Sequence, residues 1–174
     1  SAVNPNAQCF TFSGFKDTVT PKEMSATDIA RTIEDFVVSA ENATKAGFAG
    51  VEIHAANGYL FHQFFAKCAN QRTDQYGGTI ENRARILFET LDAIKARVPA
   101  IKIGVRLSPG FRTWFGMQLD DETDQLFAYV VKKLNEYDFA YLHIGGYVEA
   151  NDPTPEDSIL QTASKYNKLY QGTY

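Results

Sequence analysis

Short strand-like apolar runs alternate with longer helix-like segments along this 174-residue chain, and this alternation limits the possible folds more than any other feature. Parallel strands need crossover connections, which are usually helices, so the alternation predicts an α/β fold with right-handed crossovers. The predicted elements in chain order are a short strand over 9–12, a helix from Ser25 or Thr27 to Gly47, a strand over 50–54, a helix over 81–97, a strand over 101–107, a helix over 121–137, a strand over 139–144 and a helix from about 155, with 172–174 beginning another strand.

Two architectures fit this alternation, a doubly wound open sheet and part of a TIM (β/α)8 barrel. A nucleotide-binding doubly wound sheet usually carries a GxGxxG fingerprint, and the chain contains neither this fingerprint nor a P-loop. Long loops follow the C-terminal ends of the predicted strands. A (β/α)8 barrel keeps its active site in such loops, so we favour the barrel and treat residues 1–174 as one domain.

The chain is mildly acidic, with 17 Lys and Arg against 21 Asp and Glu and a formal net charge of −4. It has no basic block and no apolar run near the ~20 residues that span a bilayer, which disfavours nucleic acid and membranes as partners. Cys9 and Cys68 form no CxxC motif and no signal peptide is evident, so we expect two free thiols in the cytoplasm. The missing initiator Met leads us to expect a processed or truncated product.

Three polar side chains lie where the predicted strand 50–54 ends. They are His54, Asn57 and Tyr59. Hydrogen-bond donors aimed at one point polarise a carbonyl and stabilise a developing enolate, and a nearby phenol can deliver a proton as a general acid. The structural alternative is that His54 and Asn57 only satisfy backbone groups where the strand turns.

Arg106 lies near the C-terminal end of the predicted strand 101–107. A buried charge is costly unless it is paired, so this guanidinium meets either a carboxylate or an electron-rich bound group. A fixed cation beside a reduced flavin would stabilise the anionic form of that ring.

Other candidate sites are weaker. A metal site built from His54, His62 and His143 is disfavoured, because no two of them have the i, i+4 spacing of a helical zinc pair and no nearby carboxylate completes the set. A metal-dependent or phosphate-binding barrel enzyme would need carboxylates or a phosphate loop at the strand ends. Glu52 points to one face of its strand, and the sequence offers it no partner.

The polar segment 70–85 predicts a turn-rich loop in which Gly77 and Gly78 lead into the next helix, held by Arg–Asp and Arg–Glu pairs. We favour this structural role for the whole segment. Trp114 and Phe115 are placed to line a pocket, although scattered aromatic residues more often serve packing.

Several of these segments together form a specific combination of motifs. They are VEIHAANGYL at 51–60, Gln63-Phe64, NQRTDQYGGTIENR at 70–83 and VRLSP at 105–109. In this order they closely resemble the old yellow enzyme family, flavin-dependent ene-reductases, and the resemblance runs over essentially the whole chain.

This resemblance implies an FMN-containing (β/α)8 barrel that takes hydride from NADPH or NADH and reduces the C=C bond of α,β-unsaturated carbonyl or nitro compounds. It implies that His54 and Asn57 bind the carbonyl oxygen and that Tyr59 protonates the α-carbon. Arg106 matches the arginine that contacts the pyrimidine edge of the flavin. These implied roles agree with the chemistry expected from the side chains themselves.

The chain departs from the family in two respects. The family often has an acidic residue and a proline after its sixth strand, where this chain has Gly145-Gly146-Tyr147. The chain is also short, so the resemblance places it at strands four to six and the start of the seventh. The alternative function is therefore a non-catalytic half-barrel fragment that binds no flavin alone, or one that other chains or self-association complete. Cysteines of an iron–sulfur subgroup would lie beyond Tyr174.

Overall fold

The computed structural model describes residues 3, 6–112, 116–146 and 155–173. Trp114 and Phe115, which the sequence offers as pocket residues, lie outside the described residues, as does Tyr147.

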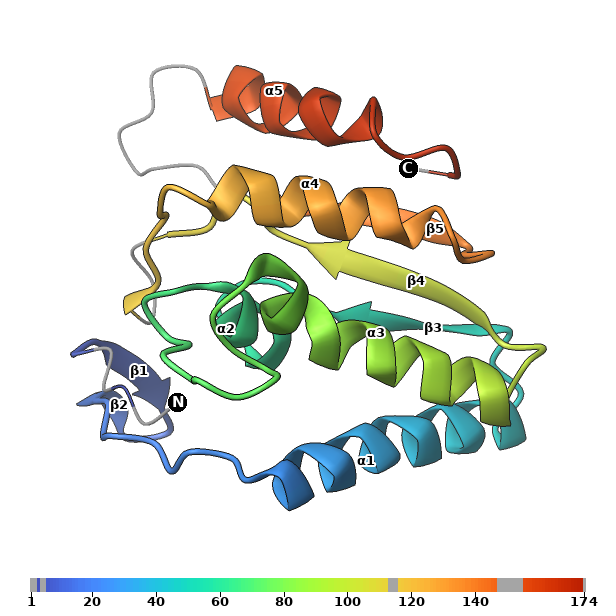
Figure 1. The fold of residues 1–174 in the computed structure, drawn as a ribbon, viewed down its shortest axis with the longest axis horizontal. Coiled ribbons are helices and arrows are strands. Elements are labelled where there is room, and N and C mark those ends of the chain that lie inside the picture. Colours follow the sequence, from blue (N-terminus) through green and yellow to red (C-terminus); the bar gives the residue numbers. More distant parts are fainter. Residues whose placement is uncertain (1–2, 4–5, 113–115, 147–154, 174) are drawn as a thin grey trace.

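A three-stranded parallel sheet forms the centre of the fold (Figure 1). Its strands are β3 (Gly50–His54), β4 (Lys102–Leu107) and β5 (Tyr141–Ile144), in the spatial order β3-β4-β5. The parallel pairing predicted from the strand–helix alternation is confirmed. The last strand begins two residues later than predicted, at Tyr141.

The longer helices follow one another in chain order beside the sheet (Figure 1). The helices are α1 (Ala26–Lys45), α2 (Leu60–Phe65), α3 (Ile80–Arg97), α4 (Thr123–Leu134) and α5 (Pro155–Asn167). Ser25 caps α1 in a capping box with Asp28, which decides between the two predicted caps. The helix predicted to begin at Asp121 begins at Thr123, with Glu122 as its N-cap residue and without a side-chain cap.

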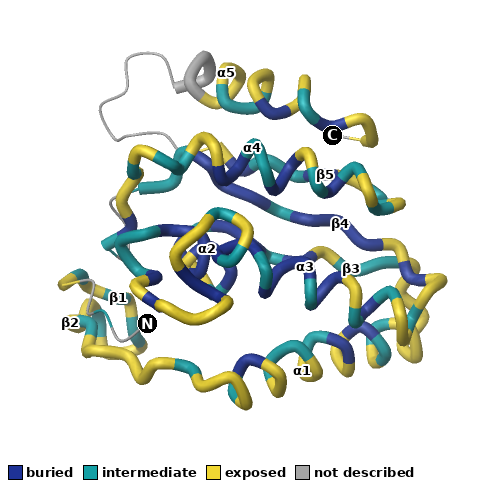
Figure 2. Tube along the Cα trace, viewed as in Figure 1, coloured by how far each residue is buried: buried dark blue, intermediate teal, exposed yellow. Residues whose placement is uncertain are grey.

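The core lies between the sheet and these helices. Side chains alternate across a strand, and Ile53, Val105 and Leu142 all point to the helical side, where each is at most 4% exposed. Leu87 and Leu91 of α3 lie in the same apolar cluster and are fully buried. Figure 2 shows β4 buried along most of its length, whereas the outer surface of α1 is exposed. The face of the sheet that points away from the helices therefore carries the polar side chains of the strands.

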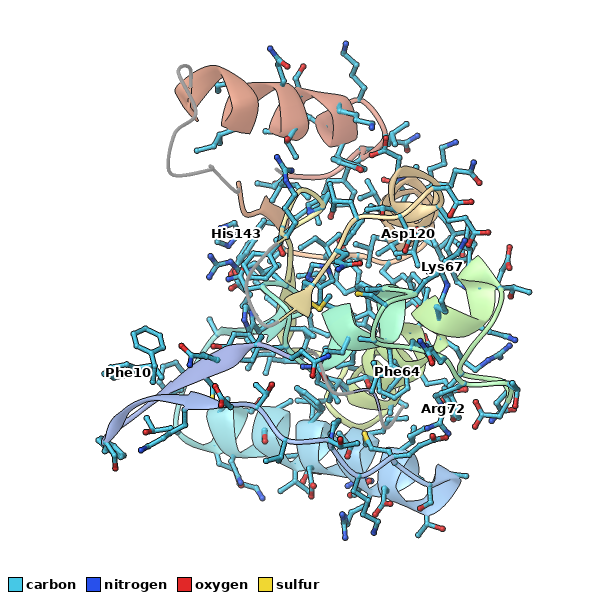
Figure 3. The ribbon with its side chains drawn as sticks, turned by 90° about the vertical axis from the view of Figure 1, so that its left-hand side faces the viewer. Phe10, Phe64, Lys67, Arg72, Asp120 and His143 are labelled. Atoms are coloured by element: carbon cyan, nitrogen blue, oxygen red, sulfur yellow. The ribbon has the colours of Figure 1, made fainter. Side chains whose placement is uncertain are left out.

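Two small elements differ from the sequence-based expectation. The first is an antiparallel hairpin of β1 (Gln8–Thr11) and β2 (Gly14–Asp17), of which only the first strand was predicted. Phe10 is 75% exposed and points away from the body of the molecule (Figure 3). The second is α2, whose six residues are too few to display a helical period.

The end of the chain lies beside β5. The Leu142 N–H donates to the Thr173 carbonyl oxygen at 2.8 Å. The described residues 172–173 form no strand, so this single bond is the part of the predicted next strand that is observed.

The loop before α3 is held by arginine–carboxylate pairs, as predicted. Arg72 is nearly buried and pairs with Asp74 and Glu23, and its backbone amide donates to the Asn70 side chain at 3.1 Å. Arg83 of α3, 1% exposed, pairs with Glu122. The loop is thus a rigid support for the start of α3.

Gly77 lies where this loop passes directly over Arg72. A Cβ atom at Gly77 would overlap the Arg72 carbonyl group, which is backbone and cannot move aside cheaply. We expect Gly77→Ala to lower the free energy of unfolding by about 1–3 kcal/mol, as overpacking does. Gly110→Ala is the control, since nothing lies within 4 Å of a Cβ there. Urea unfolding of both variants checks this, and equal stabilities would contradict it.

Candidate functional site

A row of basic side chains crosses the sheet at the C-terminal ends of its strands. His54 of β3 is in register with Arg106 of β4, and Arg106 is in register with His143 of β5. Residues paired in this way across a parallel sheet project on the same face, which is the face opposite the helices. In Figure 3 the row's His143 lies on the left, and Lys67 and Arg72 lie on the right.

His54 is neutral near pH 7 because its surroundings disfavour the charged imidazole. Partial burial lowers its pKa, the Arg106 guanidinium lowers it further, and Glu52 opposes this only in part. A neutral imidazole carries one N–H, so His54 presents a single hydrogen-bond donor without a full positive charge.

Arg106 has an unmet hydrogen-bonding capacity. Its Nε is buried and has no hydrogen-bond partner, and it forms no ion pair with a carboxylate of the described residues. Gly145 borders this guanidinium, since a Cβ there would be 3.6 Å from Nε. The structural carboxylate pair, one of the two sequence-based interpretations of Arg106, is thus not found among the described residues, and its contact with an electron-rich bound group stays a prediction.

Glu52 lies one row deeper on the same face and has partners that the sequence did not reveal. The Tyr141 hydroxyl donates to its Oε2 at 3.1 Å, and His143 Nδ1 lies 3.1 Å from the same oxygen. The Tyr141 ring lies over Gly104, where a Cβ would overlap it. The expectation that Glu52 stands alone was wrong, because its partners are about 90 positions away in the chain.

The loop that follows β3 has an unusual backbone. Asn57 has φ 57° and Gly58 has φ 77°, both in the left-handed region that asparagine and glycine tolerate best. The Ala55 N–H donates to the Arg106 carbonyl oxygen at 2.9 Å and ties the loop to β4. The loop ends at Tyr59, which is the N-cap residue of α2.

Tyr59 lies beside His54 at the mouth of the sheet. The two ring centroids are 5.2 Å apart, and the Tyr59 side chain is half-exposed. The predicted site residues His54 and Tyr59 are thus brought together, with Asn57 on the loop between them and Arg106 on the adjacent strand. Neutral donors, a phenol and a cation at one edge can bind and protonate a polarised double bond.

His62 and Ser108 lie directly beneath this loop. The Asn57 N–H donates to Ser108 Oγ at 2.7 Å, and the Gly58 N–H donates to His62 Nδ1 at 3.2 Å. His62 was considered only as a metal ligand and Ser108 only as part of a motif. The position of Ser108 just after β4, two residues after Arg106, was the available signal.

A cavity of about 330 Å³ opens on the other side of Tyr59. Its walls come from the segment before α1, which contributes Thr18, Pro21 and Met24, and from α2, which contributes Leu60 and Phe64. Tyr59 lines this cavity as well as contacting His54. The Tyr59 ring therefore lies between the row of His54, Arg106 and His143 and this largely apolar cavity.

No group of three or more His, Cys, Asp or Glu side chains that could hold a metal ion is found in the part of the chain that the structure describes. His62 faces the aromatic core beneath the loop, whereas His54 and His143 flank Arg106 on the sheet face. Cys9 and Cys68 are free thiols. None of the described helices is long and apolar enough to cross a membrane.

The burial of His62 predicts a pH-dependent stability. Burial lowers its pKa from 6.5 to about 4, so between these values the unfolded chain binds a proton that the folded chain does not. The free energy of unfolding should fall by up to about 3 kcal/mol as the pH drops through this window. Above pH 6.5 this contribution vanishes. Urea unfolding of wild type and His62→Asn from pH 7 to 4 checks it, and parallel pH profiles would contradict it.

Comparison with known proteins places this geometry in a family. Residues 2–172 match the NADH:flavin oxidoreductase / NADH oxidase family. The chain is 40% identical over 159 residues to a rice protein described as putative 12-oxophytodienoate reductase 3, and these residues are 88% of this chain and 40% of that protein. It is 44% identical over 124 residues to a probable flavin mononucleotide-dependent alkene reductase of Leishmania infantum, covering 71% of this chain and 33% of that protein.

Solved structures agree with these sequence matches. A mutant of morphinone reductase in complex with tetrahydroNAD matches with a TM-score of 0.80 and 34% identity, over 99% of this chain and 46% of that one. The old yellow enzyme homologue from Zymomonas mobilis matches with a TM-score of 0.84 and 30% identity, over 99% of this chain and 48% of that one. The chain thus spans less than half the length of these relatives, and the predicted α/β barrel fold is confirmed. The chain belongs to the NADH:flavin oxidoreductase family, the family of the old yellow enzymes.

Proposed function

We propose that the protein carrying this chain is an FMN-dependent ene-reductase that uses NADPH or NADH to reduce the C=C bond of α,β-unsaturated carbonyl compounds. One observation carries the proposal. His54 ends β3, the Asn57 loop and Tyr59 follow it, and the unpaired Arg106 Nε is on the adjacent strand at the same edge. The names of the relatives, which include a flavin mononucleotide-dependent alkene reductase, support the same chemistry.

Arg106 is the residue that we assign to FMN. Its buried Nε lacks an acceptor among the described residues, and a flavin's pyrimidine edge offers carbonyl and ring-nitrogen acceptors. Held there by Arg106, FMN would supply the hydride-transfer chemistry between the nicotinamide and the β-carbon of the substrate. A guanidinium beside the ring stabilises negative charge on it.

His54 and Asn57 are assigned to the substrate oxygen. Negative charge grows on that oxygen as the β-carbon is reduced, so a neutral imidazole N–H and an amide N–H directed to it favour the transition state over the ground state. The lowered pKa of His54 keeps its imidazole neutral, so this donor does not add a second full charge beside Arg106.

Tyr59 is assigned the final proton transfer. Its hydroxyl delivers a proton to the α-carbon as a general acid, which completes the addition of two hydrogens across the double bond. The cavity on the far side of Tyr59 is apolar enough to accept the hydrocarbon part of a substrate.

Within the whole barrel we place the chain at strands four to six, as a partial (β/α)8 domain. The Leu142–Thr173 bond supports the start of a seventh strand beside β5. The remaining strands would come from other parts of the same protein, from other chains or from self-association. The two free thiols fit a reducing compartment, and we propose the cytoplasm.

Tyr59→Phe tests the proton-transfer role in the complete, flavin-containing protein. We expect the oxidative half-reaction with an enone such as 2-cyclohexenone to slow by about a hundredfold or more, because the general acid is lost. Reduction of the flavin by NADPH should stay nearly unchanged, since it needs no proton from Tyr59. Stopped-flow absorbance measures both steps.

Equal slowing of both half-reactions would contradict the proton-donor role of Tyr59. A complete protein without an oxidised-flavin absorption spectrum would instead contradict the proposed cofactor and favour the non-catalytic half-barrel.

His54→Ala tests the oxygen-binding role. A phenolate mimics the enolate oxygen, so loss of one donor to it should weaken binding of 4-hydroxybenzaldehyde by about tenfold to a hundredfold. Calorimetric titration of wild type and variant measures the change. The control is Lys102→Ala, an exposed residue at the other end of β4. Unchanged affinity in His54→Ala would remove His54 from the site.

A further inference from the structure

His62 is the most deeply buried titratable group next to the site, and the proposed reaction does not use it directly. It lies on α2, is 3% exposed, and sits beneath the loop that carries Asn57 and Tyr59. Its ring is enclosed by Phe65, Phe111 and Phe127, with centroid distances of 6.5, 5.9 and 5.7 Å. The aromatic packing leaves the imidazole little freedom to turn.

The hydrogen bonds around His62 define its protonation state. The Gly58 N–H can only donate, so His62 Nδ1 is the acceptor of the 3.2 Å bond and the ring proton is on Nε2. Ser108 Oγ accepts the Asn57 N–H at 2.7 Å and lies 3.4 Å from His62 Nδ1, whose single lone pair already accepts the Gly58 N–H. The neutral imidazole thus accepts the backbone amide of Gly58 and contacts Ser108 Oγ, which accepts the preceding amide, that of Asn57.

These two amides belong to the residues with left-handed backbone. Asn57 and Gly58 adopt φ 57° and 77°, so their N–H groups turn inward toward Ser108 and His62. Tyr59 follows immediately, with its ring 5.2 Å from His54. A further hydrogen bond holds the same turn: the Gln63 side-chain amide donates to the Gly58 carbonyl oxygen at 2.6 Å.

We propose that His62 is a positioning residue, which acts through Ser108 and the amides of Asn57 and Gly58 to place the side chains of Asn57 and Tyr59 against His54. An apolar side chain at this position would fill the same space but leave the Gly58 amide without an acceptor and remove the polar contact of Ser108 Oγ. Because the Gly58 amide belongs to the loop, the free-energy cost of leaving it unpaired would displace the loop and not the strands of the sheet. The inference rests on the proposed function for its catalytic consequence, but the loop geometry stands independently.

The test compares two substitutions in the complete, flavin-containing protein. His62→Phe keeps an aromatic ring in the cluster and removes the acceptor, whereas His62→Asn places a carbonyl oxygen close to the former Nδ1. Leu134→Ala is the control, because Leu134 is fully buried in α4 and would lower stability without touching the loop.

Three readouts are measured. We expect His62→Phe to slow the oxidative half-reaction with 2-cyclohexenone by about tenfold or more and to weaken 4-hydroxybenzaldehyde binding to a similar extent. Hydrogen–deuterium exchange of peptide 55–60 should be faster, while flavin reduction by NADPH stays unchanged. His62→Asn should recover most of each loss, and Leu134→Ala should lower the melting temperature with none of the three effects.

The proposal is overturned if His62→Phe behaves like Leu134→Ala, or if His62→Asn recovers nothing. Should His62→Phe not fold, Ser108→Ala removes one hydroxyl from the same chain of bonds, and normal loop exchange and phenol binding in that variant would also overturn it. If Tyr59→Phe has no effect while His62→Phe still loosens the loop, the proposed function fails and the positioning role holds.

Discussion

The site depends on the register of three parallel strands. Pairing of His54 with Arg106, and of Arg106 with His143, puts three basic side chains in one row on the face that the helices do not cover. A shift of one residue in either pairing would turn a whole strand over and exchange this row for the apolar row of Ile53, Val105 and Leu142. Burial of that apolar row against the helices is therefore what keeps the basic row in place.

The guanidinium of Arg106 next to His54 affects the protonation of that histidine. Arg106 and partial burial lower the pKa of His54, so the row holds one permanent cation beside a neutral donor. Glu52 lies one row deeper and accepts from Tyr141, and it shares its carboxylate oxygen with His143. Glu52 is thus engaged by Tyr141 and His143, and the Arg106 Nε has no hydrogen-bond partner among the described residues. A ligand that offers hydrogen-bond acceptors would satisfy this nitrogen, as proposed for FMN.

A second support lies under the loop that follows β3. The left-handed Asn57 and Gly58 direct their amides into the protein, where Ser108 and neutral His62 accept them. Because Ser108 directly follows β4 and His62 belongs to α2, the loop is anchored to two elements at once. This explains how a loop can hold a half-exposed Tyr59 at a defined distance from a strand residue.

The sequence by itself determined the order of the main elements and the location of His54, Asn57, Tyr59 and Arg106 at strand ends, because apolar periodicity and strand ends are local properties. It also revealed the family, through motifs that are contiguous in the chain. Only the tertiary structure decided that Glu52 has partners on β5, that His62 supports the loop, and that Arg106 Nε has no carboxylate partner among the described residues. Those facts depend on contacts between distant residues, which strand register and helix packing create and which no local pattern encodes.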